Sequence, residues 1–203
     1  KEVQTYHNMG GPVTVLFDVK NASLMAIVVG RVGLKELPAE RPTPMRTAAT
    51  SAVGTRCLAR KDSKVLGIIG AGGEAKYHLL ALSKIRPFTI GKVYCRTEAT
   101  RREFCRSMQK WVGFDIKPTS SAQAAIEGSD VVLTATNSNV PVFDGAWLEP
   151  GMHVTSIMGG NIGLVKAGIA QTKRRELDDL TVKRSDVIIV NSRDQVIQDE
   201  QGD

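Results

Sequence analysis

A glycine-rich turn between an apolar run and an amphipathic segment narrows the choice of fold more than any other feature. The apolar run Val65–Ile69 leads directly into the sequence GAGGEA at residues 70–75, which has the spacing GxGxxA. In a strand–turn–helix unit, Gly70 permits the tight turn, Gly72 lets backbone amides approach a pyrophosphate, and Ala75 lets the helix pack closely on the sheet. Phosphates also favour the free N–H groups at a helix N-terminus. Although the pattern can mark a tight turn alone, we predict a dinucleotide site comprising Gly70, Gly72, Gly73, Glu74 and Ala75, with the Glu74 side chain facing solvent.

Apolar strands alternate with amphipathic helices through the middle of the chain. We predict strands at Val65–Ile69, Lys92–Cys95, Asp130–Thr134, Val154–Ile157 and Val187–Val190, and helices at Glu74–Ile85, Glu98–Val112 and Ala122–Glu127. Strands that are apolar on both faces and separated by helices form parallel sheets covered on both sides. The expected class is therefore α/β, with a Rossmann-type doubly wound parallel sheet.

The first fifty residues follow a different pattern. Two strand-like runs, Val13–Phe17 and Leu24–Val29, flank a turn and predict a hairpin. A proline-rich connector is expected over residues 37–44, followed by a helix over residues 45–60, where alanines and apolar residues fall at helical spacing.

Composition excludes several classes of protein. Of 203 residues, 42% are hydrophobic, which is enough for a packed core, and no apolar run reaches the roughly 18 residues of a membrane-spanning helix. The net charge of +6 with only 5% aromatic residues suits a small anionic ligand better than nucleic acid. Three cysteines favour a reducing, cytoplasmic location. Because the chain starts at Lys1 and ends just after an apolar stretch, we expect it to be truncated at both ends.

The cofactor type depends on the residues that follow the second strand. NAD sites usually place an acid there, but this sequence has Arg96 and Thr97, with Arg101 and Arg102 one turn later. A guanidinium can bind a 2′-phosphate, so we predict NAD(P)H with NADP favoured over NAD. The alternative is that the arginine only stacks on the adenine, and that Glu98 or the backbone handles NAD.

Two further strand ends fall at the same predicted sheet edge. One strand ends in three small residues, Thr134, Ala135 and Thr136. We expect these residues, together with Ile157 on the next strand, to border the nicotinamide. Asn161 follows two glycines after that next strand and is expected to face the reacting centre. The histidines have no metal-ligand spacing with one another or with the cysteines, so no metal site is predicted.

Arg46 is placed to bind a carboxylate. It lies just before the predicted helix and is followed by residues too small to block access to it. A guanidinium can hold a carboxylate with two parallel hydrogen bonds. The alternative is an arginine that is merely exposed at a helix start.

Several motifs in order resemble the ornithine cyclodeaminase/μ-crystallin family over effectively the whole chain. They are RTAATSAV at 46–53, GIIGAG at 67–72, RT at 96–97, TAT at 134–136, PVFDGAWL at 141–148 with Pro150-Gly151 following, and RELD at 175–178. The resemblance implies a homodimer with an NAD(P)-binding Rossmann domain at residues 51–190. It also implies part of a second α+β domain for substrate binding and dimerisation, formed by residues 1–50 and by the return at 191–203.

The resemblance also assigns roles to single residues. It implies that Arg46 binds the substrate carboxylate, that Thr47 lies near the cofactor, and that Lys1 contacts the substrate and assists catalysis. Glu74 stands where the family commonly has Gln, and Asn161 where ornithine-cyclising members have Asp. Because Asn cannot act as a general base, Asn161 can orient the substrate nitrogen but not move its proton.

The expected function is therefore an NAD(P)-dependent imino acid or ketimine reductase, which transfers hydride to the imine carbon of a small carboxylate-bearing substrate. Two alternatives stay open. One is an ornithine cyclodeaminase that forms proline and ammonia, and the other is a non-catalytic NADPH-binding protein like μ-crystallin. No nucleic acid or membrane is expected as a partner.

Overall fold

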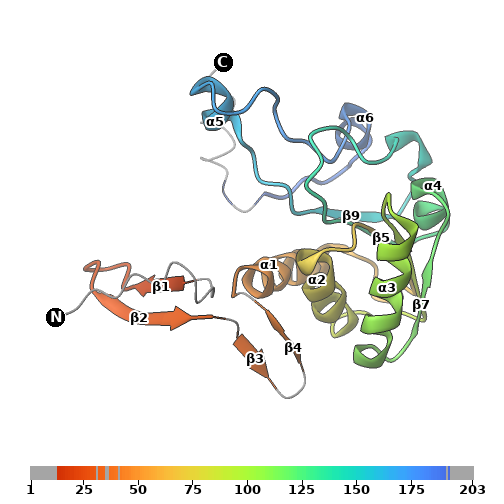
Figure 1. Cartoon of the computed structure of the whole chain (residues 1–203). Coiled ribbons are helices and arrows are strands. Elements are labelled where there is room, and N and C mark those ends of the chain that lie inside the picture. Colours follow the sequence, from red (N-terminus) through yellow and green to blue (C-terminus); the bar gives the residue numbers. More distant parts are fainter. Residues whose placement is uncertain (1–12, 31, 35–36, 41, 191, 193–203) are drawn as a thin grey trace.

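A five-stranded parallel sheet forms the centre of the molecule. The computed structural model describes residues 13–30, 32–34, 37–40, 42–190 and 192 (Figure 1). The strands are β5 (Val65–Ile69), β6 (Ile90–Tyr94), β7 (Asp115–Pro118), β8 (Val131–Thr134) and β9 (His153–Ser156), in the order β7-β6-β5-β8-β9. All four pairs are parallel. The chain runs outward from β5 to β7 and then returns to the other side of β5, which confirms the predicted Rossmann-type sheet and creates a topological switch point between β5 and β8.

At the central sheet, two strands differ from the prediction. The edge strand β7 was missed because only Ile116 among its four residues is buried and a proline ends it. Polar residues and proline are common on edge strands, so the apolar pattern is weak there. Conversely, the predicted strand Val187–Val190 forms no strand in the structure, and its side chains are exposed. Its apolar sequence lacks a hydrogen-bonding neighbour among the described residues.

The helices are α1 (Pro42–Leu58), α2 (Gly73–Ser83), α3 (Glu98–Met108), α4 (Ala122–Ile126), α5 (Ile162–Lys166) and α6 (Asp179–Lys183), with single 3-10 turns η1 (Gln109–Trp111) and η2 (Gly145–Trp147). Helices α1 to α4 lie close to the predicted ranges, whereas α5 and α6 were not predicted. Helix α1 begins earlier than expected because prolines are tolerated in a first helical turn, where N–H groups have no intrahelical partner. The expected connector instead contains β4 (Leu37–Glu40) and the start of this helix.

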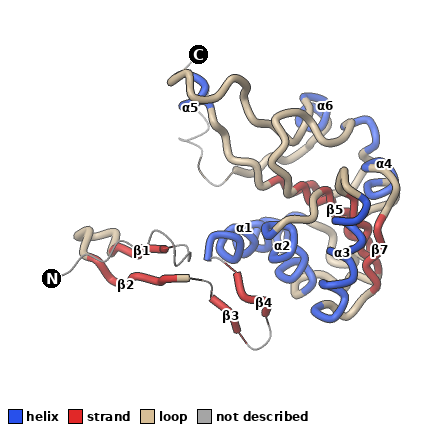
Figure 2. Tube along the Cα trace, in the orientation of Figure 1, coloured by secondary structure: helices blue, strands red, loops and turns tan. Residues whose placement is uncertain are grey.

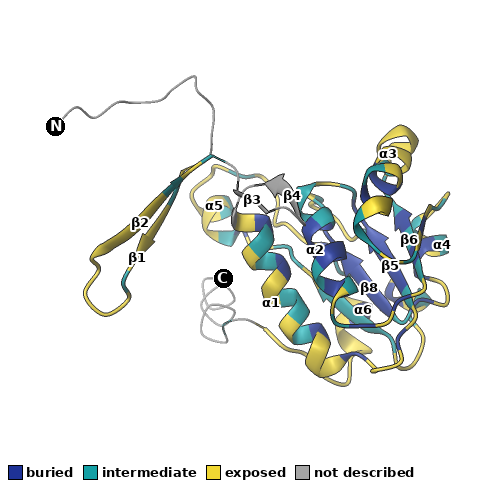
Figure 3. Ribbon diagram, turned by 90° about the horizontal axis from the view of Figure 1, so that it is seen from below, coloured by how far each residue is buried: buried dark blue, intermediate teal, exposed yellow. Residues whose placement is uncertain are grey.

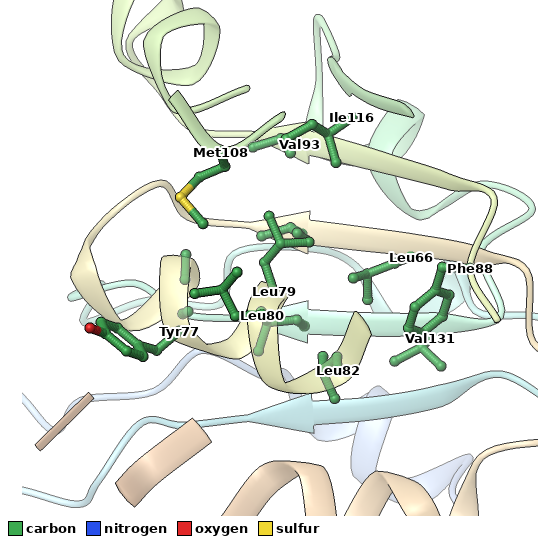
Figure 4. Packing of buried hydrophobic residues seen from close by; sticks show 14 of the residues in the cluster. Leu66, Tyr77, Leu79, Leu80, Leu82, Phe88, Val93, Met108, Ile116 and Val131 are labelled. Atoms are coloured by element: carbon green, nitrogen blue, oxygen red, sulfur yellow. The ribbon is translucent and has the colours of Figure 1, made fainter. Parts of the chain in front are cut away.

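Helices cover both faces of the sheet (Figures 1 and 2). On one face, Leu66 and Val131 from the strands pack in one cluster with Leu79 and Leu82 of α2 (Figure 4). On the other face, Ile126 of α4 is fully buried in a second cluster with side chains of β5 and β8. Each fully buried leucine stabilises the fold by about 2 kcal/mol relative to an exposed one. The two clusters therefore hold the sheet rigid beneath the carboxyl ends of its strands.

Arg86 fixes α1 against this body. Its side chain is buried, and the guanidinium donates hydrogen bonds of 2.7–3.1 Å to four carbonyl groups at and just beyond the end of α1: Thr55, Arg56, Ala59 and Arg60. A cation at a helix C-terminus satisfies carbonyls that lack intrahelical partners and interacts favourably with the helix dipole. Helix α1 therefore crosses the expected domain boundary at residues 50–51 and packs along α2.

The predicted hairpin is confirmed and extends away from the sheet (Figure 3). Strands β1 (Val13–Phe17) and β2 (Leu24–Val29) pair antiparallel, and β3 (Val32–Leu34) pairs with β4 in a second two-stranded sheet. Large apolar side chains on β1 and β2 are exposed, including Phe17 at 58% and Met25 at 66%. Two-stranded hairpins are marginally stable alone, so these apolar side chains suit a hairpin that packs against further protein.

Candidate nucleotide and substrate site

The glycine turn is held tightly between the ends of two other strands. Gly70 has φ +121°, and its N–H donates to the Tyr94 carbonyl oxygen over 2.8 Å. A Cβ atom at this position would lie 2.2 Å from the carbonyl oxygen of Ala135. Both the backbone conformation and the close approach require glycine. The turn from β5 into α2 therefore lies directly against the end of β8, as predicted from GxGxxA.

The N-terminus of α2 is open to ligand. Gly72 is the N-cap residue, is exposed, and provides no side-chain hydrogen bond to the helix. A Cβ added to it would meet no atom within 4 Å. Ala75 is fully buried, which brings the helix close to the sheet. Backbone N–H groups at such a terminus favour a phosphate, and cofactor binding by Gly72, Gly73 and Ala75 stays a prediction.

Glu74 does not face solvent as expected. Its side chain is 30% exposed, and Oε2 lies 3.8 Å from Nδ1 of the buried His78 one turn later. His78 Nδ1 lies 2.7 Å from the Glu74 carbonyl oxygen, and Nε2 lies 3.0 Å from Ser51 Oγ on α1. Burial lowers the pKa of His78, which favours a neutral ring. His78 therefore joins α1 to the first turns of α2.

Arg46, the residue predicted to bind the substrate carboxylate, belongs to α1. Arg46 is exposed and lies inside α1 rather than before it, and its neighbour Met45 packs against the same apolar cluster as Ala71 of the glycine turn. The RTAA segment thus lies on the helix that packs against α2, the helix that follows the turn. Thr47 Oγ1 donates to the Thr43 carbonyl oxygen over 2.9 Å, so its hydroxyl is used within the helix. Lys1 lies outside the described residues.

Residues after β6 lie at the same edge of the sheet. Arg96 and Thr97 are exposed, and Thr97 is the N-cap residue of α3. Arg101 packs its guanidinium over the Tyr94 ring at 5.7 Å from the ring centre. A hollow of about 470 Å³ lies between the start of α3 and the segment after β7. Arg101 and Arg102 line this hollow, whereas Arg96 and Thr97 do not. A Rossmann fold binds the adenine ribose near the end of the second strand, so a role of these arginines at the 2′ position stays a prediction.

Glu176 is the site residue that sequence reasoning missed. It is 1% exposed and accepts hydrogen bonds from Thr134 Oγ1 (2.9 Å), Thr136 N (2.5 Å), Thr136 Oγ1 (2.6 Å) and Ser156 Oγ (2.8 Å). The Thr134 and Thr136 hydroxyls therefore bind this carboxylate and do not face the open edge. The only sequence signal was an acid inside the RELD motif, and its partners lie 20 to 42 residues away.

Glu176 joins the carboxyl ends of β8 and β9, where the nicotinamide half of a dinucleotide binds in this fold. Ala135 contributes its backbone against Gly70, and Ile157 packs against the apolar cluster that includes α2. Of the four residues predicted here, Thr134 and Thr136 therefore act through hydrogen bonds to Glu176, and Ala135 and Ile157 through backbone and packing.

Asn161 closes its own loop. Its side chain is buried, with Nδ2 donating to the Thr172 carbonyl oxygen (3.0 Å) and Oδ1 accepting from Arg174 N (2.7 Å). This geometry corrects the expectation that its amide points at a reacting nitrogen, because both amide groups already have partners in the segment that leads to Glu176.

Neither a metal centre nor a membrane span is found in the described part of the chain. No three His, Cys, Asp or Glu side chains there are arranged to hold a metal ion. No helix among the same residues is both long and apolar enough to cross a bilayer. Cys57, Cys95 and Cys105 are all free thiols.

A second, half-buried histidine predicts acid sensitivity. Burial, and then the positive charge of Arg86, lowers the pKa of His153 to about 4 from 6.5, and its Nε2 lies 3.0 Å from Thr55 Oγ1. The unfolded chain then binds a proton that the folded chain does not, so stability is present above pH 6.5 and is lost as pH falls towards 4. Between pH 7 and pH 5 we expect the free energy of unfolding, measured by urea denaturation, to fall by about 2 kcal/mol more in wild type than in His153→Gln. Equal losses in both proteins would contradict a neutral His153.

Comparison with known proteins identifies the same family that the motifs indicated. Residues 11–203 match the ornithine cyclodeaminase/mu-crystallin family. Ketimine reductase mu-crystallin of Rattus norvegicus is 33% identical over 189 residues, which cover 93% of this chain and 52% of the relative. Ornithine cyclodeaminase of Agrobacterium fabrum is 36% identical over 120 residues, covering 58% and 33% of the two chains.

Solved structures show the same fold. The Δ1-pyrroline-2-carboxylate reductase of Thermococcus litoralis, in complex with NADH and L-proline, matches with a TM-score of 0.66 and 36% identity. The match covers 84% of this chain and 47% of that one. The chain thus spans about half the length of the rat relative and of the archaeal structure.

Proposed function

Because the chain belongs to the ornithine cyclodeaminase/mu-crystallin family, we propose that it is part of an NAD(P)-dependent oxidoreductase that reduces C=N bonds. The substrates would be small imino acids or cyclic ketimines bearing a carboxylate. The observation that carries this proposal is the uncapped N-terminus of α2, exposed at Gly72 beside the switch point of the sheet. Two relatives named for C=N reduction, the rat ketimine reductase and the archaeal structure with NADH and L-proline, support it.

The residues of this chain fit a nicotinamide dinucleotide. Gly70 makes the turn possible, Gly72 leaves open space at the phosphate position, and the first N–H groups of α2 would hold the pyrophosphate. Arg96 and Thr97 would border the adenine ribose. The bound cofactor supplies a hydride to the imine carbon, and with one proton on nitrogen the product is an amine.

The remaining residues would position the substrate rather than exchange its protons. Arg46 would hold the carboxylate through two charge-assisted hydrogen bonds, with Lys1 as a second contact. Glu176 would fix the backbone of Thr134–Thr136 and Ser156 beneath the nicotinamide. Asn161 would hold the loop over residues 161–174 in place. Accurate placement of the imine carbon is then the main source of rate enhancement.

We also propose the assembly and setting of the whole protein. Residues 1–50 and 191–203 would contribute to a second domain that binds substrate and forms a homodimer, and α1 would connect it to the Rossmann domain at 51–190. The exposed apolar side chains of β1 and β2 support this assignment. Arginines near the 2′ position support NADP over NAD, and free thiols support a cytoplasmic location.

The proposal is tested by following NADPH and NADH absorbance with the full-length protein. The panel should include 2-oxo acids with ammonia or methylamine and cyclic imines such as Δ1-pyrroline-2-carboxylate. We expect oxidation of the reduced cofactor with at least one carboxylate-bearing imine and none with the same imine as its methyl ester. Ammonia and proline formed from ornithine would instead indicate a cyclodeaminase, and tight NADPH binding without any turnover would indicate a binding protein.

The role of Arg46 can be tested in the same assay, with Arg56 as the matched control. Arg46→Ala should lower kcat/KM by roughly a hundredfold or more, because it removes a charge-assisted pair to the carboxylate, while cofactor affinity stays unchanged. Arg56→Ala, an exposed arginine in the last turn of the same helix, should leave turnover unchanged. Equal effects of the two substitutions on kcat/KM would show that Arg46 does not bind the substrate carboxylate.

A further inference from the structure

We propose that Glu98 sets the cofactor preference by occupying the arginines that would otherwise bind a 2′-phosphate. This inference rests on the proposed function and assigns a specificity role to a residue that need not touch the reacting atoms. It concerns the adenosine end of the site.

Glu98 holds two guanidinium groups at the start of α3. Its Oε1 accepts a hydrogen bond of 2.7 Å from Arg102 Nε, and its Oε2 lies 3.9 Å from an Arg101 terminal nitrogen. Arg101 is further restrained, because it donates to the Cys95 carbonyl oxygen over 3.1 Å and packs over the Tyr94 ring. Both arginines are therefore already engaged before any nucleotide binds.

These three charged side chains line the hollow beyond β6. The rest of its wall is formed by four small or polar residues of the segment after β7 and α4: Pro118, Thr119, Ser120 and Ala124. The Glu98 side chain is 59% exposed, so a ligand group can reach it. The hydrogen bond from Arg102, and the charges of Arg102 and Arg101, lower the pKa of Glu98, so the carboxylate stays ionised at neutral pH.

The two nicotinamide cofactors respond to this arrangement differently. A 2′-phosphate carries nearly two negative charges, so it must either displace the Glu98 carboxylate from the arginines or bind beside it. A 2′-hydroxyl is neutral, can donate to a carboxylate, and needs no such exchange. Glu98 therefore disfavours NADPH relative to NADH in a pocket whose other charges favour NADPH.

The test measures the dissociation constants of NADPH and NADH for the full-length protein by titration calorimetry at fixed ionic strength. Glu98→Gln should tighten NADPH binding by about tenfold, because the carboxylate no longer competes with the phosphate for Arg102 or repels it, and should change NADH binding by less than about threefold. In Glu98→Gln combined with Arg102→Ala, most of that gain should disappear. Glu103→Gln is the matched control, since Glu103 pairs with Arg106 on the same helix outside this hollow.

The outcomes separate this inference from the proposed function. If wild type binds neither nucleotide, the proposed function fails, and this inference fails with it. If wild type binds either one but Glu98→Gln leaves the NADPH-to-NADH ratio unchanged, only the role of Glu98 is overturned. An equal change of the ratio in Glu103→Gln, or a loss of NADH affinity with NADPH unaltered, overturns it as well.

Discussion

Gly70→Ala should abolish dinucleotide binding and destabilise the fold at the same time. An alanine at φ +121° is strained, and its Cβ would overlap the Ala135 carbonyl oxygen, which belongs to backbone and cannot move aside alone. We expect a loss of about 3 kcal/mol or more in unfolding free energy and cofactor binding weakened by a hundredfold or so. Urea denaturation and NADH titration measure the two effects.

Gly72→Ala separates the two effects. Nothing lies within 4 Å of a Cβ built at Gly72, and this residue has a φ of −93° that alanine adopts freely. Stability should therefore stay within about 0.5 kcal/mol of wild type, while the added methyl group occupies space needed by the pyrophosphate and weakens binding. Gly113→Ala, also in open space but away from the turn, should change neither quantity. Full cofactor affinity in Gly72→Ala would refute a pyrophosphate at this turn.

Glu176→Ala should be the most damaging single substitution at the nicotinamide end. It removes the acceptor of four hydrogen bonds from Thr134, Thr136 and Ser156, and it leaves the buried Thr134 hydroxyl and the half-buried donors of Thr136 without this partner. Each such group costs about 1–3 kcal/mol, so the unfolding free energy should fall by roughly 3–5 kcal/mol in total after relaxation.

Glu176→Gln provides the conservative comparison. Its oxygen can keep the two bonds from Thr136, and its amide can donate to the Thr134 and Ser156 hydroxyls, which can rotate to accept. We therefore expect Gln to restore most of the stability lost in Glu176→Ala and to restore cofactor affinity in parallel. If Gln and Ala destabilise the protein equally, the carboxylate charge rather than the hydrogen-bond network holds this edge together.

Local sequence was sufficient to predict most of the Rossmann unit. The strand Val65–Ile69 matched its prediction residue for residue, and the glycine turn formed as GxGxxA indicates, because both depend on neighbours in the chain. The hairpin strands Val13–Phe17 and Leu24–Val29 were also predicted with their observed bounds. The apolar run Val187–Val190 was predicted as a strand and is not one, since a strand needs a partner as well as an apolar sequence.

The sequence by itself determined the parallel α/β fold, the glycine-rich turn and the family, because periodicity, glycine spacing and ordered motifs are local properties. Only the tertiary structure decided where the polar side chains at the edge point. The Thr134 hydroxyl faces Glu176, Asn161 bonds within its own loop, and Arg101 and Arg102 are held by Glu98. The physical reason is that a buried or crowded polar group takes whichever partner the packed chain brings near it. That partner lies 42 residues away for Thr134 and 11 residues away for Asn161, beyond the reach of local sequence patterns.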